Sequence, residues 1–398
     1  MRLRGISRNV VALGGASFFT DVASEMLYPV IPLFLVNTLG ASPALLGMIE
    51  GLAEAVSTGL RWVGGVWSDR TGRRKPFVFL GYSVSAISKP IMGLAAYAIG
   101  WPLFLVGRCS DRFGKSIRTA ARDALIADST APEYRGLAFG FHRAVDTCGA
   151  IVGPVITLAI LAVAPGLPLA WLFLLAFIPG IASSLVVVAS VRDIPQVRPG
   201  GADARPFRLS GYPTGFWHLL AGLAVFSLGN SSDSFLILRS KEVGLSFTQI
   251  IAVYILFSLV YALAAAPCGR LSDRIGRRPL VICGLGTYAV VYAGFAYSRS
   301  PLAPWILFAV YGLYQALSEG VTKAMISDFV PPERRAGAIG LFAAVTGLGQ
   351  LVASLLAGGL WEMRVANGRL MPSFLLGVVC ALAAIPLIAY RPRPRPRQ

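Results

Sequence analysis

Residues 68–74 of the chain read Ser-Asp-Arg-Thr-Gly-Arg-Arg, and residues 272–278 read Ser-Asp-Arg-Ile-Gly-Arg-Arg, 204 positions later. A second pair repeats at almost the same distance, since residues 132–135 read Pro-Glu-Tyr-Arg and residues 332–335 read Pro-Glu-Arg-Arg. Further matches join Gly140, Ala144, Val145 and Gly149 to Gly340, Ala344, Val345 and Gly349. So many matches at nearly one offset indicate duplication of a unit of about half the chain.

The composition is that of a membrane protein. Of the 398 residues, 55% are apolar and only 14% are charged, whereas soluble domains carry about 25% charged residues. The mean hydropathy of +0.67 agrees with this interpretation. The five cysteines and two histidines show no metal-ligand or disulfide spacing. We therefore expect no disulfide framework, no structural zinc site and no cofactor.

Twelve stretches are long and apolar enough to cross about 30 Å of hydrocarbon as helices, which takes roughly 20 residues each. We predict spans at about 10–37, 43–67, 76–97, 101–126, 136–163, 168–191, 214–238, 246–269, 279–298, 302–327, 336–360 and 371–390. The first contains Asp21 and Glu25 and is too long for a cleavable signal peptide. The predicted fold is therefore an all-α integral membrane protein with twelve transmembrane helices.

The basic residues predict the orientation of these spans. The chain has 36 Lys and Arg residues. Most of those that lie outside the spans fall on the side of the membrane that holds both termini. The opposite loops hold Arg239, Lys241, Arg299, Arg364 and Arg369. By the positive-inside rule both termini are cytoplasmic. The net charge of +17 then reflects topology, and no nucleic-acid partner is expected.

The duplication and the longest polar connection divide the chain. Pro and Gly residues recur between the sixth and seventh predicted spans, as is typical of a flexible linker. We predict an N-terminal six-helix bundle at 1–191, a cytoplasmic linker at 192–213, a C-terminal six-helix bundle at 214–390 and a basic cytoplasmic tail at 391–398. Two pseudo-symmetric bundles are how many transporters build a site at the middle of the membrane.

The loop between the second and third predicted spans resembles the cytoplasmic-loop signature of the major facilitator superfamily. It reads Gly65-x-x-x-Asp69-Arg70-x-Gly72-Arg73-Arg74-Lys75, and the second half repeats it as Gly269-x-x-x-Asp273-Arg274-x-Gly276-Arg277-Arg278. The resemblance covers essentially the whole chain and implies the fold of that superfamily, with transport by alternating access. It also implies a cytoplasmic latch made by Asp69 and its arginines through charge-assisted hydrogen bonds. The alternative is that these residues only set topology and tighten a short loop.

A glycine pattern in the fifth span resembles the antiporter motif of proton-coupled exporters in the same superfamily. It reads Gly140, eight residues, Gly149, three residues, then Gly153 and Pro154. Thr157 and Leu158 replace the usual closing glycines. Small residues allow close helix packing, and a proline loosens a helix. The resemblance implies export in exchange for protons, whereas a simple packing face explains the same spacing.

Charged residues recur inside the predicted spans, where each one at the centre of a helix costs about 3 kcal/mol to insert. They must therefore be paired or face water. They are Asp21, Glu25, Glu50, Glu54, Arg61, Lys89, Arg108, Asp111, Arg112, Lys115, Arg118, Arg122, Asp123, Arg143 and Asp146 in the first half, and Asp233, Glu319 and Lys323 in the second. At about 100° per residue, those of the fourth span share one broad face. Such faces predict a polar path between the bundles.

These positions define the predicted site. Asp21, Glu25 and Glu54 lie near mid-span and are predicted to take up and release protons, the alternative being static ion pairs. The predicted substrate contacts are Glu50, Arg112, Lys115, Asn230, Asp233, Tyr254, Tyr311, Gln315 and Glu319. The predicted gating residues are Gly65, Asp69, Arg70, Gly72, Arg73, Asp273, Arg274, Arg118, Arg122, Arg143, Asp146, Gly149, Gly153 and Pro154. Lys89 receives no predicted role.

The sequence thus predicts a secondary transporter and not an enzyme, since no nucleophile–base pair or metal motif occurs. We expect a lipid-embedded monomer that exports a small organic solute across the inner (cytoplasmic) membrane in exchange for protons. One alternative is a proton-coupled importer or facilitator of an anionic metabolite, with Arg112 and Lys115 as ligands. The other is a lipid flippase.

Overall fold

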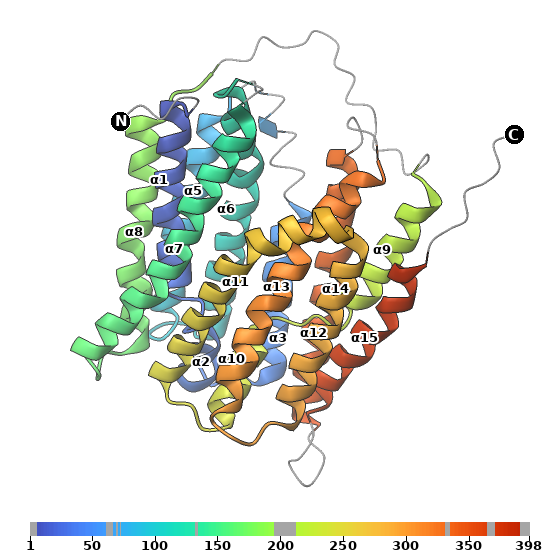
Figure 1. The fold of residues 1–398 in the computed structure, drawn as a ribbon. Helices are drawn as coiled ribbons and strands as arrows, with labels where there is room; N and C mark the ends of the chain where they lie inside the picture. The colour runs from blue at the N-terminus through green and yellow to red at the C-terminus, as the bar shows by residue number, and fades with distance from the viewer. Residues whose placement is uncertain are drawn as a thin grey trace, which may run out of the picture. The chain divides into compact units, whose positions relative to one another are not determined.

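The computed structural model of the chain is built from helices (Figure 1). It describes residues 6–60, 67, 68, 71, 73–131, 134–194, 212–330, 335–363 and 371–390, and no strand occurs in these ranges. By packing, the chain divides into two compact units. Unit 1 comprises Met1–Ser42, Leu52–Gly201 and Ser246–Ile255, and unit 2 comprises Pro43–Gly51, Ala202–Leu245 and Leu256–Gln398. The predicted bundle boundaries at 191 and 214 stay a prediction.

Unit 1 holds most helices of the first half. They are α1 (Arg8–Glu25), α2 (Ile31–Leu33), the π-helix η1 (Phe34–Thr38), α5 (Lys75–Leu94), α6 (Trp101–Asp128), α7 (Arg135–Val163) and α8 (Leu169–Ser190), with parts of α3 (Pro43–Gly59) and α11 (Phe247–Ile275). Helix α1 packs against α7 and α8, and α5 packs against α6 and α8 (Figure 1). Helices α5 and α6 cross closely, since a Cβ on Gly81 would lie 2.6 Å from the Gly114 carbonyl oxygen.

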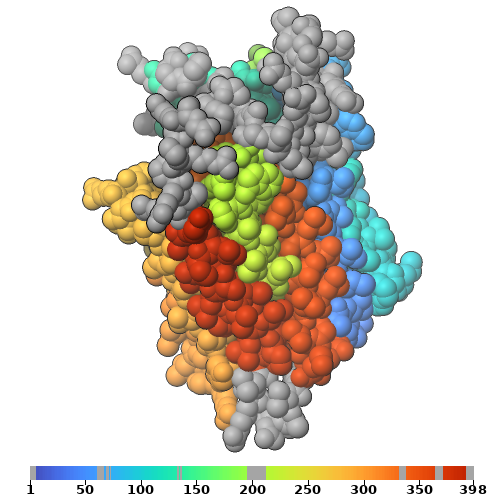
Figure 2. Space-filling view, turned by 90° about the vertical axis from the view of Figure 1, so that its right-hand side faces the viewer, coloured from blue at the N-terminus to red at the C-terminus, as the bar shows by residue number. Residues whose placement is uncertain are grey.

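Unit 2 holds most helices of the second half. They are α9 (Thr214–Ser227), α10 (Ser234–Glu242), α12 (Arg277–Tyr297), α13 (Ala303–Asp328), α14 (Arg335–Glu362) and α15 (Pro372–Ala389), with the remaining parts of α3 and α11. Helix α12 packs against α13 and α15, and α9 lies beside α15 and α14 (Figure 2). Aromatic rings fill this core, where the Tyr288 and Tyr292 centroids stack 4.0 Å apart.

Seven helices in the described part of the chain are long and apolar enough to cross a membrane: α5, α7, α8, α11, α12, α14 and α15. The helices in the other predicted spans are shorter or more polar. Helix α3 has 17 residues and α9 has 14, while α6 carries many charges along its 28 residues. Large apolar side chains such as Val290, Ile178 and Val379 are more than half exposed, as expected of a surface that lipid tails cover.

The first and seventh predicted spans are each broken, although the sequence pattern predicts continuous helices. Helix α1 ends at Glu25, because Pro29 and Pro32 follow closely and a proline has no backbone N–H to donate. The chain then resumes as α2 and η1. In the second half, α9 ends at Ser227 and α10 begins at Ser234. Both breaks place non-helical backbone beside acidic residues, an arrangement that transporters use at their binding sites.

Candidate functional site

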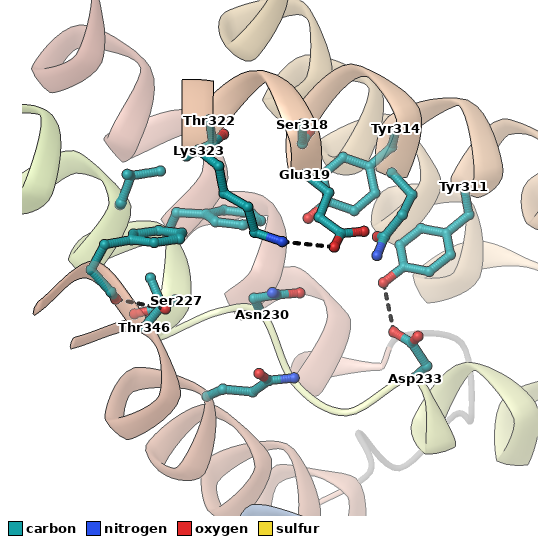
Figure 3. Close-up of a pocket in the computed structure, with 15 residues that line it drawn as sticks. Ser227, Asn230, Asp233, Tyr311, Tyr314, Ser318, Glu319, Thr322, Lys323 and Thr346 are labelled. Atoms are coloured by element: carbon teal, nitrogen blue, oxygen red, sulfur yellow. Dashed lines mark hydrogen bonds and ion pairs between the residues drawn. The ribbon is translucent and has the colours of Figure 1, made fainter. Parts of the chain in front are cut away.

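Unit 2 contains a cavity of about 260 Å³ (Figure 3). It is lined by Leu223, Phe226, Ser227, Asn230, Asp233, Tyr311, Tyr314, Gln315, Ser318, Glu319, Thr322, Lys323, Phe342, Thr346 and Gln350. Five of the predicted substrate contacts are therefore brought together: Asn230, Asp233, Tyr311, Gln315 and Glu319. The volume is just below the range of about 300–1,000 Å³ found for ligand pockets, which indicates a small solute.

Two features of the backbone turn these side chains toward one space. Tyr311, Gln315 and Glu319 are four residues apart on α13, so successive turns of the helix place them on one face. The break between α9 and α10 takes Asn230 and Asp233 out of the helical register and supplies the opposite side of the cavity. The cavity thus depends on a break that the hydrophobic pattern does not reveal.

Tyrosine hydroxyls hold the carboxylates of the cavity. The Tyr311 hydroxyl donates to Asp233 at 2.6 Å, and the Tyr261 hydroxyl donates to Glu319 at 2.8 Å. The ammonium group of Lys323 lies 3.0 Å from the other carboxylate oxygen of Glu319 (Figure 3). Each carboxylate therefore has a polar partner inside unit 2, as burial in a membrane requires.

One wall of the cavity is aromatic. The Tyr311 ring stacks on Tyr314 with centroids 5.2 Å apart and on Phe257 at 5.4 Å. The edge of Phe226 meets Tyr314 at 6.3 Å. Stacked rings present an apolar face next to the amides and carboxylates. The cavity can therefore contact both a flat apolar part and the hydrogen-bonding groups of a solute.

Unit 1 buries an ion pair that sequence reasoning missed. The Lys89 ammonium lies 3.1 Å from Asp111, and both residues are at most 5% exposed. The Ser85 hydroxyl donates to the same carboxylate at 2.5 Å, and Arg108 approaches its other oxygen at 3.9 Å. Lys89 and Asp111 lie on different predicted spans, so no spacing in the sequence could have joined them. The pair stabilises two charges inside the membrane.

Three cations of α6 differ in their surroundings. The guanidinium group of Arg118 is buried over the ring of Tyr82, 4.9 Å from the centroid, and one of its nitrogens has no hydrogen-bond partner. Arg112 is half-buried and its Nε also has no partner, whereas Lys115 is exposed. Arg118 makes no ion pair among the described residues, and its gating role stays a prediction. Arg112 and Lys115 keep donors available for an anion.

The other predicted coupling and substrate residues are spread over both units. The Tyr254 hydroxyl donates to Glu25 at 2.8 Å within unit 1, and its ring stacks on Tyr28 at 5.2 Å. Glu54 is half-buried in unit 1, where the Thr58 hydroxyl approaches its carboxylate at 3.3 Å. Glu50 is 5% exposed in the part of α3 that belongs to unit 2, and it does not line the cavity.

The glycines of α7 bring this helix against α1. A Cβ on Gly149 would lie 2.6 Å from the Phe18 carbonyl oxygen, and one on Gly153 would lie 2.7 Å from the Val22 carbonyl oxygen. Helix α7 runs without interruption through Pro154. The two helix backbones can therefore touch only because these positions lack side chains.

Thr157, which replaces a motif glycine, completes the same contact. Its hydroxyl donates to the carbonyl oxygen of Met26 at 2.8 Å, directly after the last residue of α1. The N–H groups of Val30 and Ile31 do not donate to this Met26 oxygen, because both donate to the carbonyl oxygen of Leu27. Thr157 thus satisfies a buried backbone acceptor that the break in α1 would otherwise leave unpaired.

Two acids face each other where α1 meets α7. The carboxyl groups of Asp21 and Asp146 lie within hydrogen-bonding reach of one another. The Ser17 hydroxyl donates to Asp146 at 2.8 Å and accepts a hydrogen bond from Arg122 at 3.1 Å. Arg143, 58% exposed, lies 3.3 Å from the other oxygen of Asp146. Asp146 is thus part of a polar contact between helices.

Four predicted gating residues, Gly65, Asp69, Arg70 and Gly72, lie outside the described residues. Nearby, Arg73 is exposed at the start of α5. The backbone N–H groups of Arg74, directly before α5, and of Lys75, its first residue, donate to the carboxylate of Asp193 at 3.0 and 3.3 Å. A carboxylate at a helix N-terminus is favoured by the helix dipole. Sequence reasoning missed Asp193.

Each copy of the loop makes an ion pair with an aspartate 200 residues from its counterpart, but through neighbouring arginines, since Arg277 corresponds to Arg73 and not to Arg74. Arg277 lies 2.8 Å from Asp328 and 3.9 Å from Asp273, while Arg274 is exposed. In unit 1, Arg74 lies 3.6 Å from Asp128. The two partner carboxylates are 200 residues apart, the same offset as the Pro-Glu repeat, and this signal could have identified them.

A sequence profile of the Major Facilitator Superfamily matches residues 13–240 and 219–398. The chain belongs to this superfamily. The superfamily consists of transporters, so the function predicted from the two loop copies is confirmed at this level. The fold is accordingly the twelve-helix, two-bundle fold of the major facilitators, and the chain is a multi-pass membrane protein.

Relatives in the superfamily differ in sequence identity and in the share of this chain that they match. An uncharacterized MFS-type transporter of Methanocaldococcus jannaschii is 36% identical over 95% of this chain and 94% of its own length. The multidrug resistance protein MdtH of Yersinia enterocolitica is 30% identical, over 33% of this chain and 32% of its own length. The crystal structure of a D-xylose–proton symporter superposes with a TM-score of 0.77 at 18% identity, over 96% of both chains. That likeness shows the fold alone.

Proposed function

We propose that this major facilitator is a proton-coupled exporter of a small organic solute, which binds in the cavity of unit 2. The main support is the cavity itself, because amide, hydroxyl, carboxylate and aromatic groups from α9, from the segment between α9 and α10, and from α13 and α14 surround one space. A solute that carries hydrogen-bonding groups on a flat apolar frame would match those contacts. Asn230 and Gln315 would orient it, and the rings of Tyr311 and Tyr314 would stack on its apolar part.

The proposed coupling rests on the acids of unit 1. Asp21 and Glu25 lie on α1, where Asp146 is the neighbour of Asp21 and Tyr254 is the neighbour of Glu25. Protonation of either carboxylate would therefore change its hydrogen bond to that neighbour. Glu54 is half-buried on α3. Protonation of such groups alters which contacts are favourable, and this is what coupling to a conformational change requires. In alternating access, uptake of protons from outside would drive release of the solute to the same side.

Two observations support export as the direction. The glycine spacing of α7 resembles the antiporter motif, and a multidrug resistance protein is similar over a third of the chain. We further propose that the protein acts as a monomer in the cytoplasmic membrane with both termini inside the cell, as the distribution of Lys and Arg predicts.

Reconstituted transport tests this function. A thermal-shift screen of purified protein at two pH values, against drugs, organic acids, sugars and siderophore-like compounds, would select a solute. Its flux into proteoliposomes should follow an imposed pH gradient and stop when a protonophore collapses that gradient. Flux that ignores the gradient would contradict the coupling. Gln315→Ala should weaken solute binding about five-fold through one lost hydrogen bond, whereas Gln249→Ala, outside the cavity, should leave affinity unchanged.

The cations of α6 favour a second candidate, a facilitator of an anionic metabolite. Arg112 has a buried Nε without a partner, and the ammonium group of Lys115 is exposed. An oxyanion would satisfy both donors. If this candidate is correct, the variant with both Arg112→Gln and Lys115→Gln folds but no longer binds organic anions. Unchanged anion affinity in that variant would eliminate it.

A further inference from the structure

We propose that Asp21 and Asp146 form a single proton-binding site in which the two carboxyl groups share one proton. The inference rests on the proposed coupling to protons and deepens it, because it moves the proton from one acid to a pair. Asp146 enters the sequence prediction only as a gating residue, and nothing in the spacing of the two acids, 125 residues apart, joins them. The pair arises from the contact between α1 and α7.

The glycines of α7 set the distance between the two acids. Gly149 lies one turn beyond Asp146 on the same face of α7, and a Cβ at this position would lie 3.1 Å from the Cβ of Asp21. On α1, Ser17 lies one turn before Asp21, and its hydroxyl is bonded to Asp146 at 2.8 Å. Two contacts one turn apart therefore hold the carboxyl groups of neighbouring helices within hydrogen-bonding reach.

A hydrogen bond between two carboxyl groups requires a proton on one of them, because a pair of carboxylates offers only acceptors. Two ionised carboxylates at this distance also repel, so one of them retains a proton that belongs to the pair and not to either residue. When α7 moves away from α1, the shared hydrogen bond breaks and the O–H bond can release its proton to water. The closed contact and the bound proton are therefore two aspects of one state.

Charged groups around the pair limit it to one proton. Glu25 on α1 adds negative charge, and Lys115 on α6 adds positive charge near Asp21. Arg122 of α6 donates to the Ser17 hydroxyl, which in turn donates to Asp146. Arg143 of α7 lies 3.3 Å from Asp146. His142 also lies near Asp146, and Asp123 lies 2.9 Å from Arg122. The cations stabilise one ionised carboxylate, and the hydrogen bond holds the other carboxyl in its protonated form.

Infrared difference spectroscopy of the purified full-length protein in lipid tests the pair, with the proton itself as the probe. A pH titration of the wild type should show a carbonyl-stretching band of one protonated carboxyl group. The proposal expects Asp21→Asn and Asp146→Asn each to remove this same band, because an asparagine amide can donate to the remaining carboxylate. Asp123→Asn is the matched control and should leave the band unchanged, since Asp123 is 44% exposed and lies 2.9 Å from Arg122. If the band survives in either variant, the pair does not share a proton.

A milder variant covers the case in which the asparagine variants fail to fold, as judged by thermal unfolding. Ser17→Ala keeps both carboxyl groups and removes one hydrogen bond to Asp146, so it should change the frequency of the band without removing it. An unaltered band would overturn the proposal. Because these measurements need no solute, they are separate from the transport assay: loss of pH-driven flux in the wild type refutes the proposed function, whereas an Asp146→Asn protein that keeps the band refutes only the shared site.

Discussion

Replacing Gly149 by alanine should destabilise the protein through a single, localised clash. The added Cβ would lie 2.6 Å from the Phe18 carbonyl oxygen, whereas ordinary contact begins near 3.4 Å, so the backbones must separate by about 0.8 Å. The obstacle is main-chain oxygen, which cannot rotate away as the end of a flexible side chain can. Overpacking of this kind costs about 1–3 kcal/mol in the free energy of unfolding.

Gly140 supplies the matched control on the same helix. Nothing lies within 4 Å of a Cβ built there, so Gly140→Ala should be neutral or stabilise α7 by up to about 1 kcal/mol through its higher helix propensity. Unfolding by SDS in mixed micelles, followed by tryptophan fluorescence, measures both variants. We expect the Gly149→Ala protein to be less stable than the Gly140→Ala protein by at least about 1 kcal/mol. Equal stabilities would show that α1 and α7 do not meet as described.

Two further substitutions test buried contacts of unit 1. Thr157→Val removes the donor to Met26 and should lower the free energy of unfolding by about 1–3 kcal/mol, while Thr157→Ser should retain most of the stability; the same unfolding assay distinguishes them. Asp111→Asn leaves Lys89 buried without its closest counter-charge and should cost about 3–5 kcal/mol. Adding Lys89→Met should recover most of that loss, and a double variant no more stable than the single one would contradict the pairing.

The family and the fold could be predicted from the sequence because both depend on repeated local signals. The loop copies at 68–74 and 272–278 are short, polar and duplicated, so they stand out from an apolar background. The breaks in the first and seventh spans were not predictable from hydropathy, because a window of apolar residues counts length and not backbone hydrogen bonds. Pro29 and Pro32 are the signals that reveal the first break.

The candidate site divides in a similar way. Tyr311, Gln315 and Glu319 lie on one helix, so helical periodicity alone predicts that they face a common space. The partners of Lys89, Asp21 and the α5 N-terminus come from other segments of the chain, and only packing brings them together. Tyrosines assigned to the substrate also act as donors to carboxylates, a role that residue type alone does not specify.

The carboxylate of Asp193 has a practical consequence for anyone who divides this protein. The Asn9 side chain makes two hydrogen bonds of 2.8 Å to the backbone of Arg192, and Asp193 accepts from the N-terminus of α5. The segment after α8 is therefore bound to α1 and α5. A split gene for co-expression of two fragments should therefore be cut downstream of residue 194. A cut at the end of α8 would remove the contacts of Arg192 and Asp193 from the first fragment.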